Sequence, residues 1–309
     1  MPASNRMQAM IPKGCSVIPN PRGTAPGIAH ENESHRLFCL PGVPTEMQAM
    51  FDATIRPMLR SSGGDACAIS ARLHCYGISE ARLGETIADL MARGRNPLVG
   101  TTASGAVLTL RLLAQGDNAI TAQRLLDADC AEIRNRLGHV IFGQDDETLH
   151  GAVTRILIDQ KKTIATAESC TGGLLAARLT ETPGCSACFR QGFVTYSNES
   201  KSQLLGVSAT FLAEHGAVSE AVARAMSIEC RSAARSDYAL SITGIAGPGG
   251  GQPPDKPVGL VFIGLADSND CEVQSLRFGE HLSRDEIRDR ACKSALNLLR
   301  IRLLRSRPA

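Results

Sequence analysis

A serine stands in the segment Glu168-Ser-Cys-Thr-Gly-Gly173, directly after residues 163–168, which we expect to form a buried strand. A serine at a strand-to-helix turn is held out of the sheet, where it can attack a substrate. Its commoner role is to cap the helix, and this alternative stays open for Ser169. Free amides at a helix start can stabilise an oxyanion or bind a phosphate. We expect these donors at Thr171, Gly172 and Gly173.

Two further polar clusters follow expected strands: residues 196–201, Tyr-Ser-Asn-Glu-Ser-Lys, and residues 243–248, Thr-Gly-Ile-Ala-Gly-Pro. In an α/β sheet, functional residues gather at the carboxyl ends of strands. Ser169 and Lys201 form a coherent pair there, because serine–lysine hydrolases need only a neutral amine as base. Lysine in water has a pKa of about 10.4, and burial lowers it. Tyr196 is expected to position the amine. The alternatives are an exposed helix residue for Lys201 and a buried strand aromatic for Tyr196.

The eleven cysteines raise the possibilities of a thiol nucleophile, a disulfide framework or a metal site. Cys170 is the rival nucleophile, but it needs a histidine base and the three clusters contain none. The count of cysteines is odd, and the pair Cys185 and Cys188 lacks the two further ligands that zinc requires. We therefore expect reduced thiols that act as small apolar residues, with neither a metal nor an organic cofactor.

Nine of the fourteen residues in 244–257 are Gly or Pro, a composition shared by nucleotide-binding loops. A Walker loop fails, because Gly250 and Gly251 stand where Lys and Ser or Thr are required. A Rossmann fingerprint fails because Gln252 occupies the third glycine position. The loop either approaches a substrate closely by another route or is a surface loop without a function.

The composition describes a globular protein that is nearly neutral. The chain has 309 residues, 43% of them hydrophobic, and 33 basic against 31 acidic side chains give a formal charge of +2. This balance does not favour nucleic acid or an anionic membrane as a partner. No apolar run approaches the ~18 residues of a membrane span, and the N-terminus has no apolar signal core. We expect a cytoplasmic protein.

Strands and helices alternate through residues 146–305, which predicts an α/β domain with helices on the faces of the sheet. The middle residues, 65–145, predict a small α+β module. Apolar residues at helical spacing indicate helices over 83–91 and 126–137, and alternation indicates a strand at 108–112. Residues 1–62 are irregular and rich in Pro and Gly, with a single short helix at 45–59 and a linker at 61–64.

Several strings in order over some 150 residues resemble the C-terminal domain of the CinA family. They are Thr166–Gly173, Gly192–Asn198, His215–Ser219, Thr243–Pro248 and Lys256–Gly259. The resemblance implies a three-layer α/β amidohydrolase that converts nicotinamide mononucleotide to nicotinate mononucleotide and ammonia, as in pyridine nucleotide salvage. The partner would be this small nucleotide, and we expect a homo-oligomer, a dimer or larger.

The resemblance assigns roles residue by residue. It implies that Ser169 is the nucleophile and that Tyr196 and Lys201 complete the catalytic site. Thr243 matches a substrate-contacting position, and either Arg284 or Arg288 matches an arginine that holds the nucleotide. The remaining substrate-binding positions that we expect, besides the helix-start residues, are Asn198, Gly244 and Gly247.

Residues 65–145 are similar to the family's KH-like middle domain, and residues 1–62 to the back end of its molybdopterin-binding-like domain. Gly94-Arg-Asn-Pro97 lacks the second glycine of a KH loop, so we do not expect RNA binding. The metal-binding front of the N-terminal domain is missing, through a misplaced start or a true truncation, so ADP-ribose pyrophosphatase activity should be lost. The alternatives are residual activity of that kind, or a non-catalytic binding protein associated with competence or DNA damage.

Overall fold

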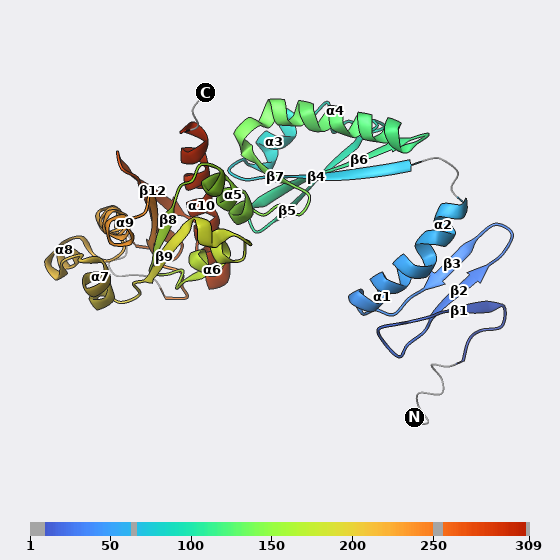
Figure 1. Cartoon of the computed structure of the whole chain (residues 1–309), viewed down its shortest axis with the longest axis horizontal. Helices are drawn as coiled ribbons and strands as arrows, with labels where there is room; N and C mark the ends of the chain where they lie inside the picture. Colours follow the sequence, from blue (N-terminus) through green and yellow to red (C-terminus); the bar gives the residue numbers. More distant parts are fainter. Residues whose placement is uncertain (1–9, 63–66, 250–255, 307–309) are drawn as a thin grey trace. The chain divides into compact units, whose positions relative to one another are not determined.

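The structure, a computed structural model, describes residues 10–62, 67–249 and 256–306. Figure 1 shows the elements along the chain. The chain divides into two compact units: Met1–Ala68 with Gln115–Ala122, and Ile69–Ala114 with Gln123–Ala309.

A five-stranded sheet in the order β12-β11-β10-β8-β9 organises the C-terminal half of the chain. Strand β8, next to the edge strand β9, pairs in parallel with both β9 and β10, whereas β11 and β12 are antiparallel to their neighbours. The carboxyl ends of β8, β9 and β10 therefore meet at one edge. The strands are β8 (Ile164–Glu168), β9 (Phe189–Val194), β10 (Tyr238–Gly244), β11 (Leu260–Ala266) and β12 (Cys271–Arg277).

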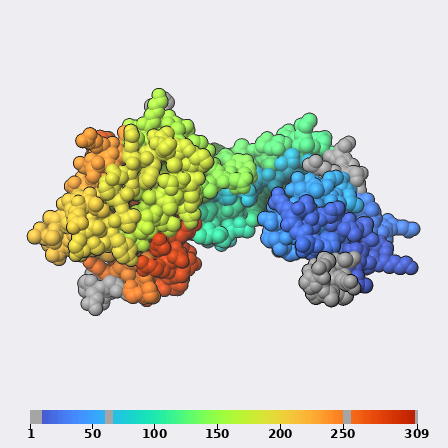
Figure 2. Space-filling view, turned by 60° about the horizontal axis from the view of Figure 1, so that its bottom comes forward, coloured from blue at the N-terminus to red at the C-terminus, as the bar shows by residue number. Residues whose placement is uncertain are grey.

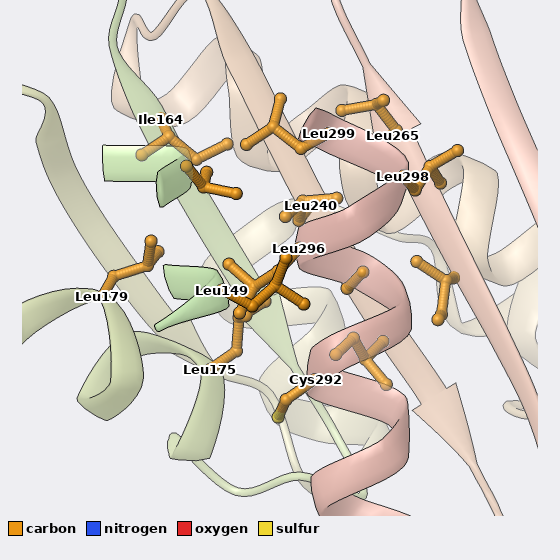
Figure 3. Packing of buried hydrophobic residues seen from close by; sticks show 14 of the residues in the cluster. Leu149, Ile164, Leu175, Leu179, Leu240, Leu265, Cys292, Leu296, Leu298 and Leu299 are labelled. Atoms are coloured by element: carbon orange, nitrogen blue, oxygen red, sulfur yellow. The ribbon is translucent and has the colours of Figure 1, made fainter. Parts of the chain in front are cut away.

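Three helices cover each face of this sheet. One layer consists of α5 (Leu149–Asp159), α6 (Leu174–Thr180) and α10 (Arg284–Arg305), and the other of α7 (Asn198–Leu205), α8 (Ala209–His215) and α9 (Glu220–Ala234). Successive side chains of a strand point to opposite faces. Accordingly, Ile164 and Leu240 pack in the core with α10 (Figure 3), while Ala165 and Ala239 pack in the core with α9. This three-layer arrangement confirms the α/β fold.

The elements before residue 250 and those after residue 255 belong to the same sheet and the same hydrophobic core. In Figure 2 the yellow, orange and red atoms, which follow one another along the chain, pack together. The longest helix in this core is α10, which buries Ile287, Leu296 and Leu299 among other residues. Its N-terminus is fixed by the capping box of Ser283 and Glu286.

The middle module has a four-stranded sheet, order β5-β6-β4-β7, against two helices. These elements are β4 (Cys67–Cys75), α3 (Glu80–Thr86), β5 (Leu98–Ser104), β6 (Val107–Gly116), α4 (Ala119–Leu137), the short 3-10 turn η3 (Gly138–Val140) and β7 (Ile141–Gln144). The strand expected at 108–112 and the helix at 126–137 are present. The helix expected over 83–91 ends at Thr86, and a turn carries Ile87 and Leu90 into the same core. Burial of these side chains requires the apolar spacing but not a continuous helix.

The expectation that the N-terminal residues are irregular was wrong for residues 15–39. They form an antiparallel sheet of β1 (Cys15–Ile18), β2 (Gly27–Glu31) and β3 (Arg36–Cys39), and its strands are so short that turn residues dominate the sequence. The expected helix is present as α1 (Pro44–Met50), the π-helical turn η2 (Phe51–Ile55) and α2 (Arg56–Ser62). Ile18, Ala29, Met50 and Ile55 form a small core. The expected linker lies partly outside the described residues.

Candidate active site

Ser169 lies at the carboxyl end of β8, in the turn that leads to α6. Its amide donates to the carbonyl of Ile242 at 2.9 Å, and its carbonyl accepts from the amide of Gly172 at 3.0 Å. Gly172 and Gly173 have positive φ values of 60° and 92°, which favour glycine over residues with a Cβ. The two glycines therefore let the chain reverse within two residues, and Ser169 stays half-buried at the end of the strand.

Lys201 is brought to Ser169 by α7, the helix that follows β9. Ser197 caps α7 by accepting from the amide of Ser200, and Lys201 lies one turn further along. Its Nζ is 3.2 Å from Ser169 Oγ, and the residue is only 1% exposed. Thus the two residues that the sequence paired from a separation of 32 positions are in hydrogen-bond contact.

Burial lowers the pKa of Lys201 below its ordinary value of 10.5, against smaller opposing effects of Cys170 and Glu199. The carbonyls of Thr195 and Tyr196 accept from Nζ at 2.9 and 3.3 Å. A neutral amine has two N–H groups and one lone pair. With both N–H groups donated to these carbonyls, the lone pair is left for the Ser169 hydroxyl, as a general base requires.

Cys170, the rival nucleophile, lies in the core beneath the turn. Its side chain is 6% exposed, and burial raises the thiol pKa to about 12. The thiolate, which is the reactive form, is therefore nearly absent at neutral pH. In this geometry Cys170 is a packing residue beside Ser169.

Glu168 was missed by the sequence reasoning, which treated it only as the end of a strand. The residue is 1% exposed, and its carboxylate accepts three backbone amides at the start of α6. Gly173 and Leu175 donate to Oε2 at 3.0 and 2.9 Å, and Ala176 donates to Oε1 at 2.8 Å. A carboxylate is the acceptor expected at a helix N-terminus, where amides are unpaired and the dipole is positive. Glu168 stands at the last buried strand position, six residues before α6, and neither its spacing nor its polarity signals this role in the sequence.

This capping changes which amides are available to an oxyanion. The amide of Gly173 is held by Glu168, and that of Gly172 by the carbonyl of Ser169. Within the described part of the chain, the amides of Cys170 and Thr171 donate to no other residue. The expected donor set of Thr171, Gly172 and Gly173 thus becomes Cys170 and Thr171. Both lie directly after the candidate nucleophile.

Arg284 joins the other two polar clusters. Its guanidinium donates to the hydroxyl of Tyr196 at 2.9 Å and to the carbonyl of Gly247. Tyr196 is 59% exposed, so it is not the buried aromatic considered from the sequence, and it approaches the Lys201 amine through its carbonyl and not its hydroxyl. The glycine loop and the segment before α7 are thereby held together beside Ser169.

Arg288, one turn further along α10, contacts the turn that holds Ser169. It donates to the carbonyl of Thr171 at 2.9 Å and pairs with Asp285 at 3.3 Å. Together, the three clusters predicted from the sequence meet at the carboxyl ends of β8, β9 and β10, and both candidate arginines reach them. Among the described residues, no group of three or more His, Cys, Asp or Glu side chains could hold a metal ion.

Comparison with known protein families places these observations in context. The model described as "CinA C-terminal domain" matches residues 146–303, and that described as "Damage-inducible protein CinA KH domain" matches residues 70–143. The chain belongs to the CinA family.

Relatives in this family align over nearly the whole chain. A "CinA-like protein" of Synechococcus sp. (strain CC9902) is 43% identical over 98% of this chain and 72% of its own length. A "putative competence-damage inducible protein" of Alkaliphilus oremlandii is 42% identical over 97% and 72%. The crystal structure of competence/damage inducible protein CihA from Agrobacterium tumefaciens is 39% identical, with a TM-score of 0.48, and covers 51% of this chain and 97% of its own.

In this CinA-family chain the other residues that we expected to bind substrate differ in their exposure to solvent and in their contacts. The hydroxyl of Thr243 is buried and donates to the carbonyl of Ala217 at 2.7 Å, so it supports the segment before α9. Asn198 is exposed in the first turn of α7. A Cβ on Gly244 would lie 2.7 Å from the Leu260 carbonyl, so this glycine is required by strand packing. Gly247 has a positive φ of 84° and offers its carbonyl to Arg284.

No described helix has both the length and the apolar composition needed to cross a membrane.

Proposed function

We propose that this chain is a nicotinamide-nucleotide amidohydrolase, a hydrolase that acts on the linear amide of nicotinamide mononucleotide and releases ammonia. The observation that carries the proposal is the 3.2 Å contact between the buried Lys201 Nζ and Ser169 Oγ. The choice of nicotinamide mononucleotide rests on the resemblance to the CinA C-terminal domain and on the arginines beside the serine.

In the first half of the reaction, neutral Lys201 accepts the proton of the Ser169 hydroxyl while Oγ attacks the carboxamide carbon. The negative charge moves to the carboxamide oxygen, where the amides of Cys170 and Thr171 can donate to it. Each such donor is worth roughly 3–4 kcal/mol of barrier in known oxyanion holes. The C–N bond then breaks, and the proton on Lys201 passes to the leaving nitrogen, so that ammonia leaves and a nicotinoyl ester remains on Ser169.

In the second half, water attacks the ester carbon and Lys201 accepts a proton from it. The C–O bond to Ser169 breaks, the proton returns to Oγ, and nicotinate mononucleotide is released. Lys201 thus acts as base and acid in turn, and the carbonyls of Thr195 and Tyr196 hold the amine in place throughout. The ammonium form has a third N–H, which the Ser197 carbonyl can accept at 3.5 Å.

The nucleotide phosphate is proposed to bind to one of the two arginines of α10. Arg284 contacts the exposed Tyr196, and Arg288 contacts the Thr171 carbonyl. A guanidinium can bind phosphate through two parallel N–H groups, which a lysine cannot. Arg284 has no carboxylate partner among the described residues, whereas Arg288 is paired with Asp285. We therefore assign the phosphate contact to Arg284.

The test is incubation with nicotinamide mononucleotide in the presence of a chelator, followed by assays of ammonia and nicotinate mononucleotide in equal amounts. Free nicotinamide serves as a comparison substrate, because it has the amide but not the phosphate. We expect equimolar products and a strong preference for the nucleotide. Activity that disappears with the chelator would contradict the metal-free mechanism.

The same preparation tests the two alternatives. Release of AMP from ADP-ribose would indicate residual pyrophosphatase activity of residues 1–62. Absence of any ammonia, together with full cellular function of a Ser169→Ala protein, would indicate a binding role. We further propose a functional division into residues 1–62, 65–145 and 146–305, with amide hydrolysis confined to the last.

A further inference from the structure

A cavity lies at the edge of the C-terminal sheet opposite Ser169, at the amino ends of β8 and β10. Its volume is about 510 Å³, within the range of small-molecule sites. Five basic side chains line it, of which Lys162 is paired with Asp237. The other four come from three places in the chain: Lys161 before β8, Arg190 on β9, and Arg231 and Arg235 at the end of α9. The five residues of β8 separate this cavity from Ser169 by about 16 Å at the rise of a strand.

The carboxylates of the cavity do not neutralise these four cations. Asp237 accepts from the amide and hydroxyl of Thr163 and pairs with Lys162 at 3.1 Å. Asp267 accepts two backbone amides and pairs with Arg302 at 2.5 Å. Each carboxylate thus has a cation of its own besides the four. Positive charge is left in a concave space.

The backbone at two of the four cations is held in an unfavourable conformation. Lys161 and Arg235 have φ values of 54° and 49°, and both follow the last turn of a helix, where glycine is the usual residue. For a residue with a Cβ this conformation costs roughly 1 kcal/mol. Both side chains line the same cavity. Two residues with an unfavourable backbone conformation thus both place a positive charge in this cavity, which indicates that the charge has a function.

We propose that this cavity binds a compact phosphorylated metabolite with at least two adjacent phosphate charges. Several arginine and lysine side chains in one cavity match an anion of several charges, and arginine can donate two N–H groups to one phosphate. Arg231 is already oriented, since its Nε donates to the Asp237 carbonyl at 3.2 Å and its terminal nitrogens are left for a ligand. A nucleic acid would need a basic surface extended along a groove, whereas these cations line a single hollow.

The test uses inorganic pyrophosphate as the probe and isothermal titration calorimetry on the full chain. The double variant Lys161→Asn/Arg235→Asn removes two charges and keeps residues that tolerate the left-handed backbone. The control, Arg93→Gln/Arg111→Gln, removes the same charge from exposed positions of the middle module. Thermal unfolding of each protein verifies that it is folded.

We expect the wild-type chain and the control to bind pyrophosphate with similar affinity, weakening as ionic strength rises. The cavity variant should bind pyrophosphate about tenfold more weakly or worse, because it loses two charge-assisted contacts. A tenfold change in affinity corresponds to about 1.4 kcal/mol. Undetectable binding by the wild type, or equal binding by the two double variants, would overturn the proposal. So would a single-stranded oligonucleotide that binds more tightly than pyrophosphate and loses affinity in the cavity variant.

Discussion

Arg284 Nη2 donates to the hydroxyl of Tyr196 at 2.9 Å, across 88 positions of sequence. The same guanidinium also reaches the carbonyl of Gly247. The segment after β9 and the loop after β10 are therefore held by one side chain from α10. The Lys201 amine donates to the Tyr196 carbonyl, whereas the Tyr196 hydroxyl accepts from Arg284.

The first prediction separates the two residues of this contact. Tyr196→Phe removes only the hydroxyl, so kcat should stay within about threefold and KM should rise by a few-fold, as expected for loss of one hydrogen bond. Arg284→Gln should raise KM for nicotinamide mononucleotide by about tenfold or more, because a charge-assisted phosphate contact is lost. Steady-state ammonia release measures both. A hundredfold fall in kcat for Tyr196→Phe would place the hydroxyl in proton transfer and contradict this interpretation.

The second prediction concerns the thiol next to the nucleophile. Because Cys170 is buried with its pKa raised to about 12, iodoacetamide should alkylate it slowly, and Cys170→Ala should keep kcat within a few-fold. Mass spectrometry of the peptide that contains Cys170, followed in parallel with activity, makes the check. Complete inactivation that tracks alkylation, with protection by substrate and an inactive Cys170→Ala protein, would identify the thiol as the nucleophile.

The third prediction tests the carboxylate that caps α6. Glu168→Gln replaces an acceptor of three buried amides with a group that has one oxygen, so the free energy of unfolding should fall by about 2 kcal/mol or more. The matched control is Glu181→Gln at the far end of α6. There an exposed ion pair is lost, and the change should stay below about 1 kcal/mol. Urea unfolding measures both, and equal effects would contradict the capping role.

The fourth prediction follows from the lowered pKa of Lys201. Between that pKa and 10.5 the unfolded chain binds a proton that the folded chain does not, so folding becomes more favourable as pH rises. Lys201→Met, which has no such group, provides the reference. The unfolding free energy of the wild type minus that of Lys201→Met should increase from neutral pH toward 10.5. A difference that is flat or decreases with pH would show that Lys201 is charged in the folded protein.

Much of the site could be predicted because strand ends in an α/β sheet converge. The cluster of Ser169 and that of Lys201 each follow a strand with parallel pairing to its neighbour, and this topology brings them together. The capping role of Glu168 could not be predicted in this way. It depends on a carboxylate turning back toward amides five to eight positions later, which neither spacing nor polarity specifies.

The N-terminal sheet shows a different limit of the sequence. Strands as short as β1 and β3, with four residues each, hold too few residues to show a clear alternation of apolar and polar side chains. The Pro and Gly residues around them therefore dominate the sequence pattern. Their burial is decided by the packing of Met50 and Ile55 from the following helical segment against Ile18. Such a core appears only when both elements are considered together.

The most direct test of the account is the turnover of nicotinamide mononucleotide by Ser169→Ala, Lys201→Met and the double variant, with Lys201→Arg as the charge-retaining control. Each single variant should lose at least about 10³-fold in kcat/KM and the double variant hardly more, because the two residues act as one unit. Lys201→Arg should not restore activity, since a guanidinium stays protonated. A Ser169→Ala protein that keeps turnover within tenfold of the wild type would contradict the account.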